Sequence, residues 1–106
     1  MFYNKLVRNN IPVIIEKSGK KCTYRVADPN EVKELLINKL HEEVEELKNA
    51  NNIEEVLEEV ADITSVLREY CNINKVSFAD SVIKQIGKET EKGNFSKHIV
   101  LLEVID

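Results

Sequence analysis

Apolar side chains recur at helical spacing in three stretches of the chain, which predicts three principal helices. The first stretch follows Asp28 and reaches about Asn49. The second starts at Asn52 and reaches about Tyr70 or Cys71. The third begins near Ser77 and should end at Gly93, because glycine commonly follows the last helical residue. The connector between the first two stretches is short, so we expect those helices to pack as antiparallel neighbours.

Capping patterns mark the start of each predicted helix. In every case a Ser, Asn or Asp is followed three residues later by an acid, which is the spacing of a capping box. The three pairs are Asp28 with Glu31, Asn52 with Glu55, and Ser77 with Asp80. Pro29 also suits the first position of a helix that starts after Asp28.

Shorter elements are predicted at both ends of the chain. Pro12 disfavours a helix that starts earlier, but a short helix beginning near it fits the pattern. Residues 21–27 alternate β-favouring side chains and predict a short strand. Residues 99–105 are apolar and β-branched, so we expect a strand or an extended segment packed on the helices.

These elements predict one domain over residues 1–106 with a mainly α fold. The expected architecture is an antiparallel bundle of three principal helices with short extended terminal segments. Three helices with this much apolar surface would leave one face uncovered, so we expect oligomerisation to complete the bundle.

Two glutamates stand where the apolar stripes call for aliphatic side chains. Glu43 lies between Leu40 and Leu47 at the position that completes the first stripe. Glu59 follows Val56 by three residues in the second stripe. Both carboxylates should therefore face the space between the two helices.

Each misplaced glutamate has an acidic partner one turn further on. Glu46 follows Glu43, and Asp62 follows Glu59, both at a spacing that puts the pair on one helix face. Four converging carboxylates would repel one another and lose hydration unless a divalent cation neutralised them. Magnesium prefers such oxygen ligands and often shares them with phosphates. The alternative is that these acids are only solvated helix faces, since acids are common on exposed helices.

Charge is distributed unevenly, although the net charge is only −4. Residues 42–62 hold nine acids and one lysine, whereas both ends of the chain are basic. This layout suits a polyphosphate ligand held by a carboxylate-bound metal, and the acidic balance argues against a nucleic-acid polymer as partner. No apolar run is long enough to span a bilayer and the N-terminal run is too short for a secretory signal, so we expect a cytoplasmic protein without a membrane partner.

The acidic pattern resembles the metal signature of the all-α nucleoside triphosphate pyrophosphohydrolases, the superfamily that includes MazG proteins and phosphoribosyl-ATP pyrophosphohydrolase. Residues 40–47 and 58–63 look like that family's EExxEL and EExAD motifs. Residues 3–8 with the following Ile-Pro resemble the opening of its short MazG-like members, and the Lys-rich Gly-Phe segment at 88–97 resembles their ending. The resemblance covers nearly the whole chain and implies a single MazG-like domain.

This resemblance implies a magnesium-dependent hydrolase that cleaves a nucleoside triphosphate, or a related nucleotide, between the α and β phosphates. Manganese is a possible substitute. The implied metal ligands are Glu43, Glu46, Glu59 and Asp62, with Glu42 as an additional ligand or water-orienting base beside Glu43. The implied phosphate-binding residues are Lys5, Arg8, Lys88, Lys92 and Lys97. The chain departs from the family pattern at Asn9 and Asn10, and at Asn94 after Gly93.

A second hypothesis is a catalytically silent helical module that senses nucleotides or binds proteins, with the acids serving as a charged seam. The sequence leaves open which nucleotide is bound, whether one or two ions are held, and whether a neighbouring subunit completes the site.

Overall fold

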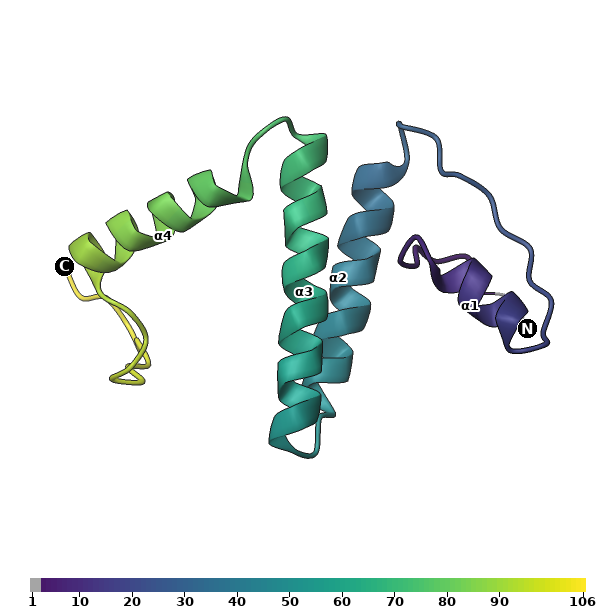
Figure 1. Ribbon diagram of the computed structural model, residues 1–106. Helices are drawn as coiled ribbons and strands as arrows, with labels where there is room; N and C mark the ends of the chain where they lie inside the picture. Colours follow the sequence, from purple (N-terminus) through teal and green to yellow (C-terminus); the bar gives the residue numbers. More distant parts are fainter. Residues whose placement is uncertain (1–2) are drawn as a thin grey trace.

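The computed structural model describes residues 3–106, and over that range it contains four α-helices and no strand (Figure 1). The helices are α1 (Ile11–Lys17), α2 (Val32–Lys48), α3 (Ile53–Ile73) and α4 (Phe78–Lys92). The prediction of a mainly α fold is confirmed. Among these four helices, none has both the length and the apolar character needed to cross a bilayer.

Helices α2 and α3 form the antiparallel pair that the short connector predicts (Figure 1). Asn52 caps α3 as expected: its side-chain oxygen accepts a hydrogen bond from the backbone N–H of Glu55 at 2.9 Å. The Glu55 carboxylate in turn accepts from the backbone N–H of Asn51 at 2.9 Å. These bonds fix the entry into α3 and thereby its alignment with α2.

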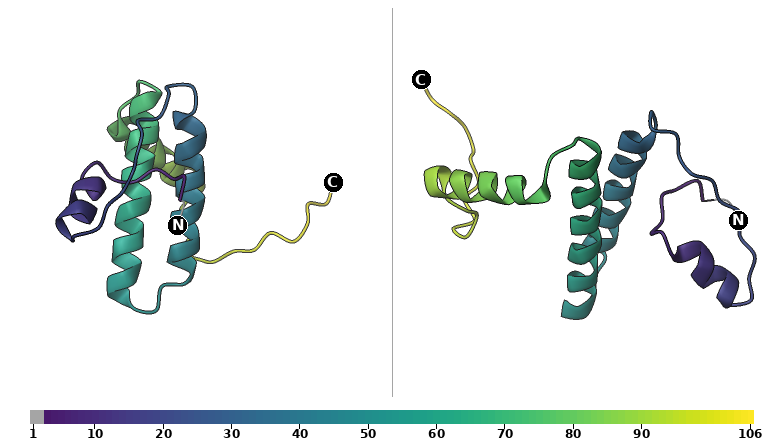
Figure 2. Two further views of the ribbon diagram at one scale, coloured as in Figure 1. Left: turned by 90° about the vertical axis from the view of Figure 1, so that its right-hand side faces the viewer. Right: turned by 45° about the horizontal axis from the view of Figure 1, so that its top comes forward.

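Helix α4 begins with the predicted capping box of Ser77 and Asp80 and ends before Gly93, whose φ of 86° is readily adopted only by glycine. It does not complete a three-helix bundle, however. Its first residues contact α3, where the guanidinium of Arg68 lies 4.5 Å from the centre of the Phe78 ring. Beyond them α4 extends away from the hairpin (Figures 1 and 2).

The start of α2 differs from its prediction, because the helix begins at Val32 rather than at Pro29. Glu31 accepts a backbone hydrogen bond from Asp28 at 2.9 Å, which is half of the expected capping box. The same carboxylate also accepts two hydrogen bonds from Arg25, at 2.7 and 2.8 Å. Glu31 therefore closes a turn that precedes the helix.

Of the shorter elements, only the helix near Pro12 is found, as α1 with Pro12 in its first turn. The predicted strand at residues 21–27 is wrong, and residues 99–105 are extended but neither paired nor packed on the helices. A strand needs the backbone groups of a neighbouring strand, and the described part of the chain provides none. Leu102, for example, keeps 89% of its surface exposed.

The chain is far more extended than a compact domain of its length. Its radius of gyration is 18.0 Å, against about 13 Å expected for a compact chain of about 100 residues. Among the described residues, Leu36 is the one buried apolar residue, with 5% of its surface exposed. Large apolar side chains of α4 and of the tail remain exposed, including Ile83 at 67% and Phe95 at 93%. The α2–α3 hairpin is thus the packed part of the structure.

The cap of α3 provides a test of how the hairpin is stabilised. Replacing Asn52 by Ala removes the side-chain acceptor for the Glu55 N–H, so we expect the free energy of unfolding to fall by about 1 kcal/mol. Urea titration followed by circular dichroism measures this change. Asn51→Ala is the matched control, because only the backbone of Asn51 takes part in the cap. Equal losses in both variants would contradict the capping role.

Candidate metal centre

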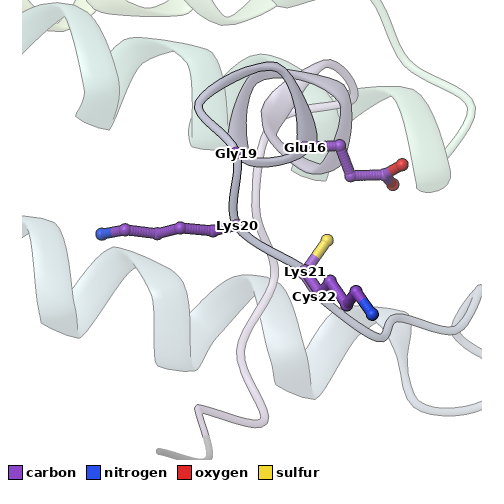
Figure 3. A pocket seen from close by; sticks show the side chains of 5 residues that line it. All are labelled: Glu16, Gly19, Lys20, Lys21 and Cys22. Atoms are coloured by element: carbon purple, nitrogen blue, oxygen red, sulfur yellow. The ribbon is translucent and has the colours of Figure 1, made fainter.

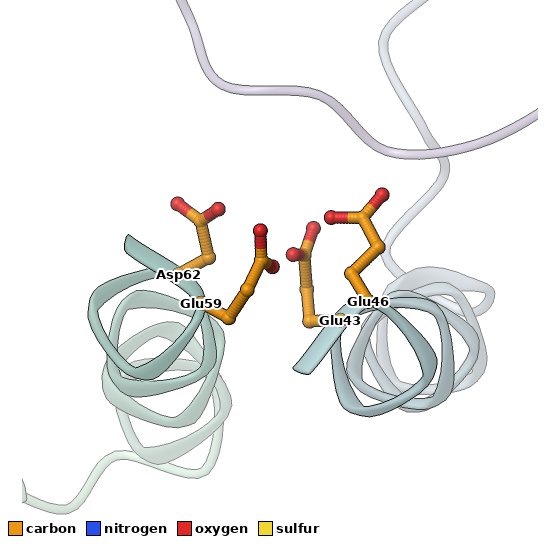
Figure 4. Close-up of side chains that lie close together, drawn as sticks. All are labelled: Glu43, Glu46, Glu59 and Asp62. Carbon is orange, nitrogen blue, oxygen red and sulfur yellow. The ribbon is translucent and has the colours of Figure 1, made fainter. Parts of the chain in front are cut away.

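Four carboxylates from α2 and α3 converge in the space between the two helices (Figure 4). Each of Glu43, Glu46, Glu59 and Asp62 offers one oxygen, and these oxygens all lie within 4.8 Å of one another. The i, i+3 spacing places each pair on one helix face, and the antiparallel packing sets the two faces against each other. The convergence expected from the misplaced acids is therefore present in the structure.

The two central glutamates are the ones that interrupt the apolar stripes. Glu43 keeps only 5% of its surface exposed, Glu59 is half-buried, and each has a buried Oε2 atom without a hydrogen-bond partner in the described structure. Asp62 is half-buried and Glu46 is exposed at the rim. Since a buried carboxylate oxygen without a partner is energetically costly, the two Oε2 atoms indicate a place for a ligand.

Burial also changes how these glutamates titrate. Loss of hydration, together with the neighbouring Glu43 and Glu46 carboxylates, raises the pKa of Glu59 to about 7. Loss of hydration likewise raises the pKa of Glu43, although Lys39 opposes this effect. In the metal-free protein, protonation of Glu59 therefore reduces the repulsion among the acids, which a bound cation would also reduce.

The donor set fits a hard divalent cation. All four side chains supply oxygen, which magnesium and manganese prefer. Opposite ligands of a magnesium ion lie about 4.2 Å apart, at about 2.1 Å from the ion. The 4.8 Å limit on the oxygen separations is close to this value, so small side-chain rotations bring the oxygens to coordination distance.

Glu42 lies beside this cluster but faces lysines. Its Oε1 accepts a hydrogen bond from Lys5 Nζ at 2.8 Å, and its Oε2 lies 3.4 Å from Lys39 Nζ. The bond from Lys5 and the charge of Lys39 lower the pKa of Glu42, so it stays ionised at neutral pH. Glu42 is therefore a charged carboxylate at the rim of the cluster, with a lowered pKa, whereas the pKa of Glu59 is raised.

Lys39 is a site residue that the sequence reasoning missed. Its Nζ lies 3.3 Å from Glu43 Oε1 as well as 3.4 Å from Glu42 Oε2. It precedes these acids by three and four residues, a spacing that predicts contact on one helix face. This spacing was visible in the sequence, but lysine and glutamate are often spaced in this way on exposed helices, so it does not by itself indicate a site.

The N-terminal segment reaches the other side of the cluster. Arg8 Nη2 donates a hydrogen bond to Asp62 Oδ1 at 2.7 Å and another to Ser65 Oγ at 3.1 Å. Ser65 was not predicted, although it follows Asp62 by one turn. In Figure 4 the N-terminal chain, in pale purple, passes above the carboxylates. Lys5 and Arg8 thus lie at the acidic cluster, as two of the five predicted phosphate-binding residues.

The other three predicted phosphate-binding residues lie elsewhere. Lys88 and Lys92 are on α4 and Lys97 follows it, and Figure 1 shows this part of the chain projecting away from the hairpin. Within residues 3–106, none of these lysines forms an ion pair with the cluster.

A hollow near the end of α1 is a weaker candidate for a site. It is lined by one local segment, comprising Glu16 and residues 19–22 (Figure 3). The side chains of Glu16 and Lys20 point in different directions, so polar groups do not converge on a common ligand position. In the acidic cluster, by contrast, four carboxylates converge on a common position.

Comparison of the chain with protein-family models, with curated proteins and with solved structures found no match.

The raised pKa of Glu59 predicts how stability depends on pH when metal is removed. Between the ordinary carboxyl pKa of 4.5 and about 7, the folded state binds more protons than the unfolded state. The free energy of unfolding should therefore fall as pH rises through this window. Glu59→Gln resembles the protonated side chain, so we expect a flatter profile and a higher melting temperature than wild type at about pH 8.

Thermal melts in a chelator, from about pH 5 to about pH 8, measure this difference. Glu58→Gln is the control, because Glu58 is the exposed neighbour of Glu59 and should leave the wild-type slope unchanged. Parallel profiles for wild type and Glu59→Gln would show that Glu59 does not titrate in this range.

Proposed function

We propose that the protein is a magnesium-dependent pyrophosphohydrolase that hydrolyses the α–β phosphoanhydride of a nucleoside triphosphate or a related nucleotide. The observation that carries this proposal is the pair of unpartnered, buried Oε2 atoms of Glu43 and Glu59 within a four-carboxylate cluster. The resemblance of residues 40–47 and 58–63 to the all-α pyrophosphohydrolase motifs supports it independently of the geometry.

The cation would be held by Glu43, Glu46, Glu59 and Asp62, and manganese could take the place of magnesium. When bound, the metal supplies Lewis-acid stabilisation of phosphate oxygens and acidifies water. The carboxylates come from two helices that pack against each other, so only small side-chain rotations would be needed to bind a ligand. This preorganisation favours charge stabilisation without rearrangement during the reaction.

Residues at the rim have separate tasks in this proposal. Lys5 and Arg8 place positive charge beside the acids, where phosphate oxygens would lie. Glu42, held ionised by Lys5 and Lys39, can accept a hydrogen bond from the attacking water and orient it. Lys39 also fixes the orientation of Glu43 through its 3.3 Å ion pair.

The reaction is an attack of water on the α-phosphorus, with cleavage of its bond to the bridging oxygen. The products are a nucleoside monophosphate and pyrophosphate. No protein nucleophile is needed, so catalysis would depend on positioning and on neutralising phosphate charge. Base and sugar contacts, which would distinguish one nucleotide from another, are not required by this chemistry.

A second copy of the chain is part of the proposal. Large apolar side chains of α4 and of the tail are exposed, while Leu36 is the one apolar residue that residues 3–106 bury. A partner that covers this surface would complete the bundle and could bring the lysines of α4 to a cluster. We therefore propose a homodimer or a higher oligomer.

One observation favours the alternative of a non-catalytic helical module. Lys5, Lys39 and Arg8 already compensate part of the acidic charge through ion pairs within the chain. Such pairs would be sufficient for a charged seam that binds a partner without turnover. Measurements of turnover and metal binding separate the two functions.

Glu43→Gln and Glu59→Gln test the proposed activity. Each substitution removes the charge of one central ligand and keeps its size, so we expect pyrophosphate release to fall by at least about 100-fold with magnesium present. The assay measures pyrophosphate across a panel of nucleotides, including deoxynucleotides, dUTP and phosphoribosyl-ATP. Helical content by circular dichroism should stay unchanged.

Glu45→Gln and Glu58→Gln are the matched controls, since both are exposed neighbours of the central ligands. They should retain wild-type activity. Full activity in the Glu43 and Glu59 variants would show that the metal site is misplaced, and wild-type protein without activity on any nucleotide would favour the non-catalytic module.

Ile86→Lys tests the proposed assembly. Ile86 lies on α4 with 59% of its surface exposed, and a lysine there would be costly to bury against a partner. We expect sedimentation velocity to show a dimer or larger species for wild type and a shift towards monomer for the variant. Gln85→Lys, on the same helix, is the control. A monomeric wild type would contradict the proposed oligomer.

A further inference from the structure

The N-terminal segment is fastened across the acidic cluster at two points. Lys5 binds Glu42 on α2 at 2.8 Å, and Arg8 binds Asp62 and Ser65 on α3 at 2.7 and 3.1 Å. We call residues 3–8 the strap. Figure 4 shows this chain passing over the open side of the carboxylates, opposite the interior of the hairpin. Its two cations therefore lie on the side from which a ligand would enter.

Arg8 is the member of the strap that contacts a proposed metal ligand directly. Its guanidinium already neutralises part of the charge of Asp62, one of the four converging acids. A divalent cation at the cluster would be repelled by a guanidinium in that position and would share the same carboxylate with it. In this role, the ion pair would compete with a bound cation for Asp62.

An opposite role for Arg8 is physically reasonable. Hydrogen bonds to the outer oxygen of a ligating carboxylate can orient the ligand and strengthen metal binding. In that case Arg8 and the cation would bind cooperatively. The two roles predict changes of opposite sign when Arg8 is replaced.

We propose that the strap is an ion-pair switch, in which Arg8 holds Asp62 in the metal-free protein and transfers to a phosphate group once a divalent cation is bound. This inference rests on the proposed function, because it takes the acidic cluster as the metal site. The ligand recognised by Arg8 is the phosphate group of a nucleotide or of free pyrophosphate.

Exposure and chemistry both suit Arg8 to this transfer. Its side chain is 58% exposed while paired with Asp62, so it can leave the carboxylate without disrupting packed apolar contacts. A guanidinium binds phosphate through two parallel hydrogen bonds as readily as it binds a carboxylate. The transfer exchanges the ion pair with Asp62 and the hydrogen bond to Ser65 Oγ for two hydrogen bonds to a phosphate group.

Binding of manganese and of pyrophosphate to Arg8→Gln tests the switch without an activity assay. Titration calorimetry should show manganese binding about two- to fivefold tighter than in wild type, because a competing cation has been removed. Binding of pyrophosphate to the manganese-loaded variant should be weaker by a similar or larger factor. A purely structural role would shift both affinities in the same direction.

Two further variants complete the test. Arg8→Lys keeps the charge but loses the planar fork, so its manganese affinity should stay near wild type while pyrophosphate binding weakens. Arg25→Gln removes a different exposed arginine, which pairs with Glu31, and should leave both affinities unchanged.

The outcomes separate this inference from the proposed function. Manganese binding that is unchanged or weaker in Arg8→Gln, with wild type binding normally, would overturn the switch and leave the metal site standing. Tighter manganese binding with unchanged pyrophosphate binding would also overturn it, since Arg8 would then not transfer. If neither wild type nor Arg8→Gln binds manganese, the proposed metal site fails together with the switch.

Discussion

The mutual repulsion of four carboxylates between two packed helices is the constraint on which the site depends. Glu43 and Glu59 occupy positions that aliphatic side chains would fill at an ordinary helix interface, and each leaves an oxygen without a partner. Such an arrangement is costly unless positive charge or a proton is supplied. The surroundings supply both: Lys39 and Arg8 contact two of the acids, and the pKa of Glu59 rises to about 7.

The acids at the cluster fall into two groups, one stabilised in the charged form by lysines and one that loses hydration. Glu42 is ion-paired by two lysines and has a lowered pKa, whereas Glu43 and Glu59 lose hydration and have raised pKa values. Adjacent residues on one helix thus have opposite electrostatic character. This contrast is what a metal site with a separate water-orienting carboxylate would require, and it supports the proposed division between central ligands and rim.

The rest of the chain is organised around the hairpin without enclosing it. The strap approaches from one side, and α4 departs from the C-terminal end of α3 with its apolar residues exposed (Figure 1). A chain with a radius of gyration of 18.0 Å gains little from burial within itself. The proposed second copy would provide the missing packing and would bring the separated basic and acidic regions together.

Local signals in the sequence determined the caps at Asn52 and Ser77 and the pairing of acids on one face of each helix, because caps and i, i+3 spacing act within one or two turns. The packing of α2 against α3 then brought the two acidic pairs together. Tertiary structure alone decided where the strap lies, how α4 is directed, and that residues 21–27 and 99–105 are not strands. These features depend on partners distant in sequence: Arg8 meets Asp62 from 54 residues away, and a strand exists only beside another strand.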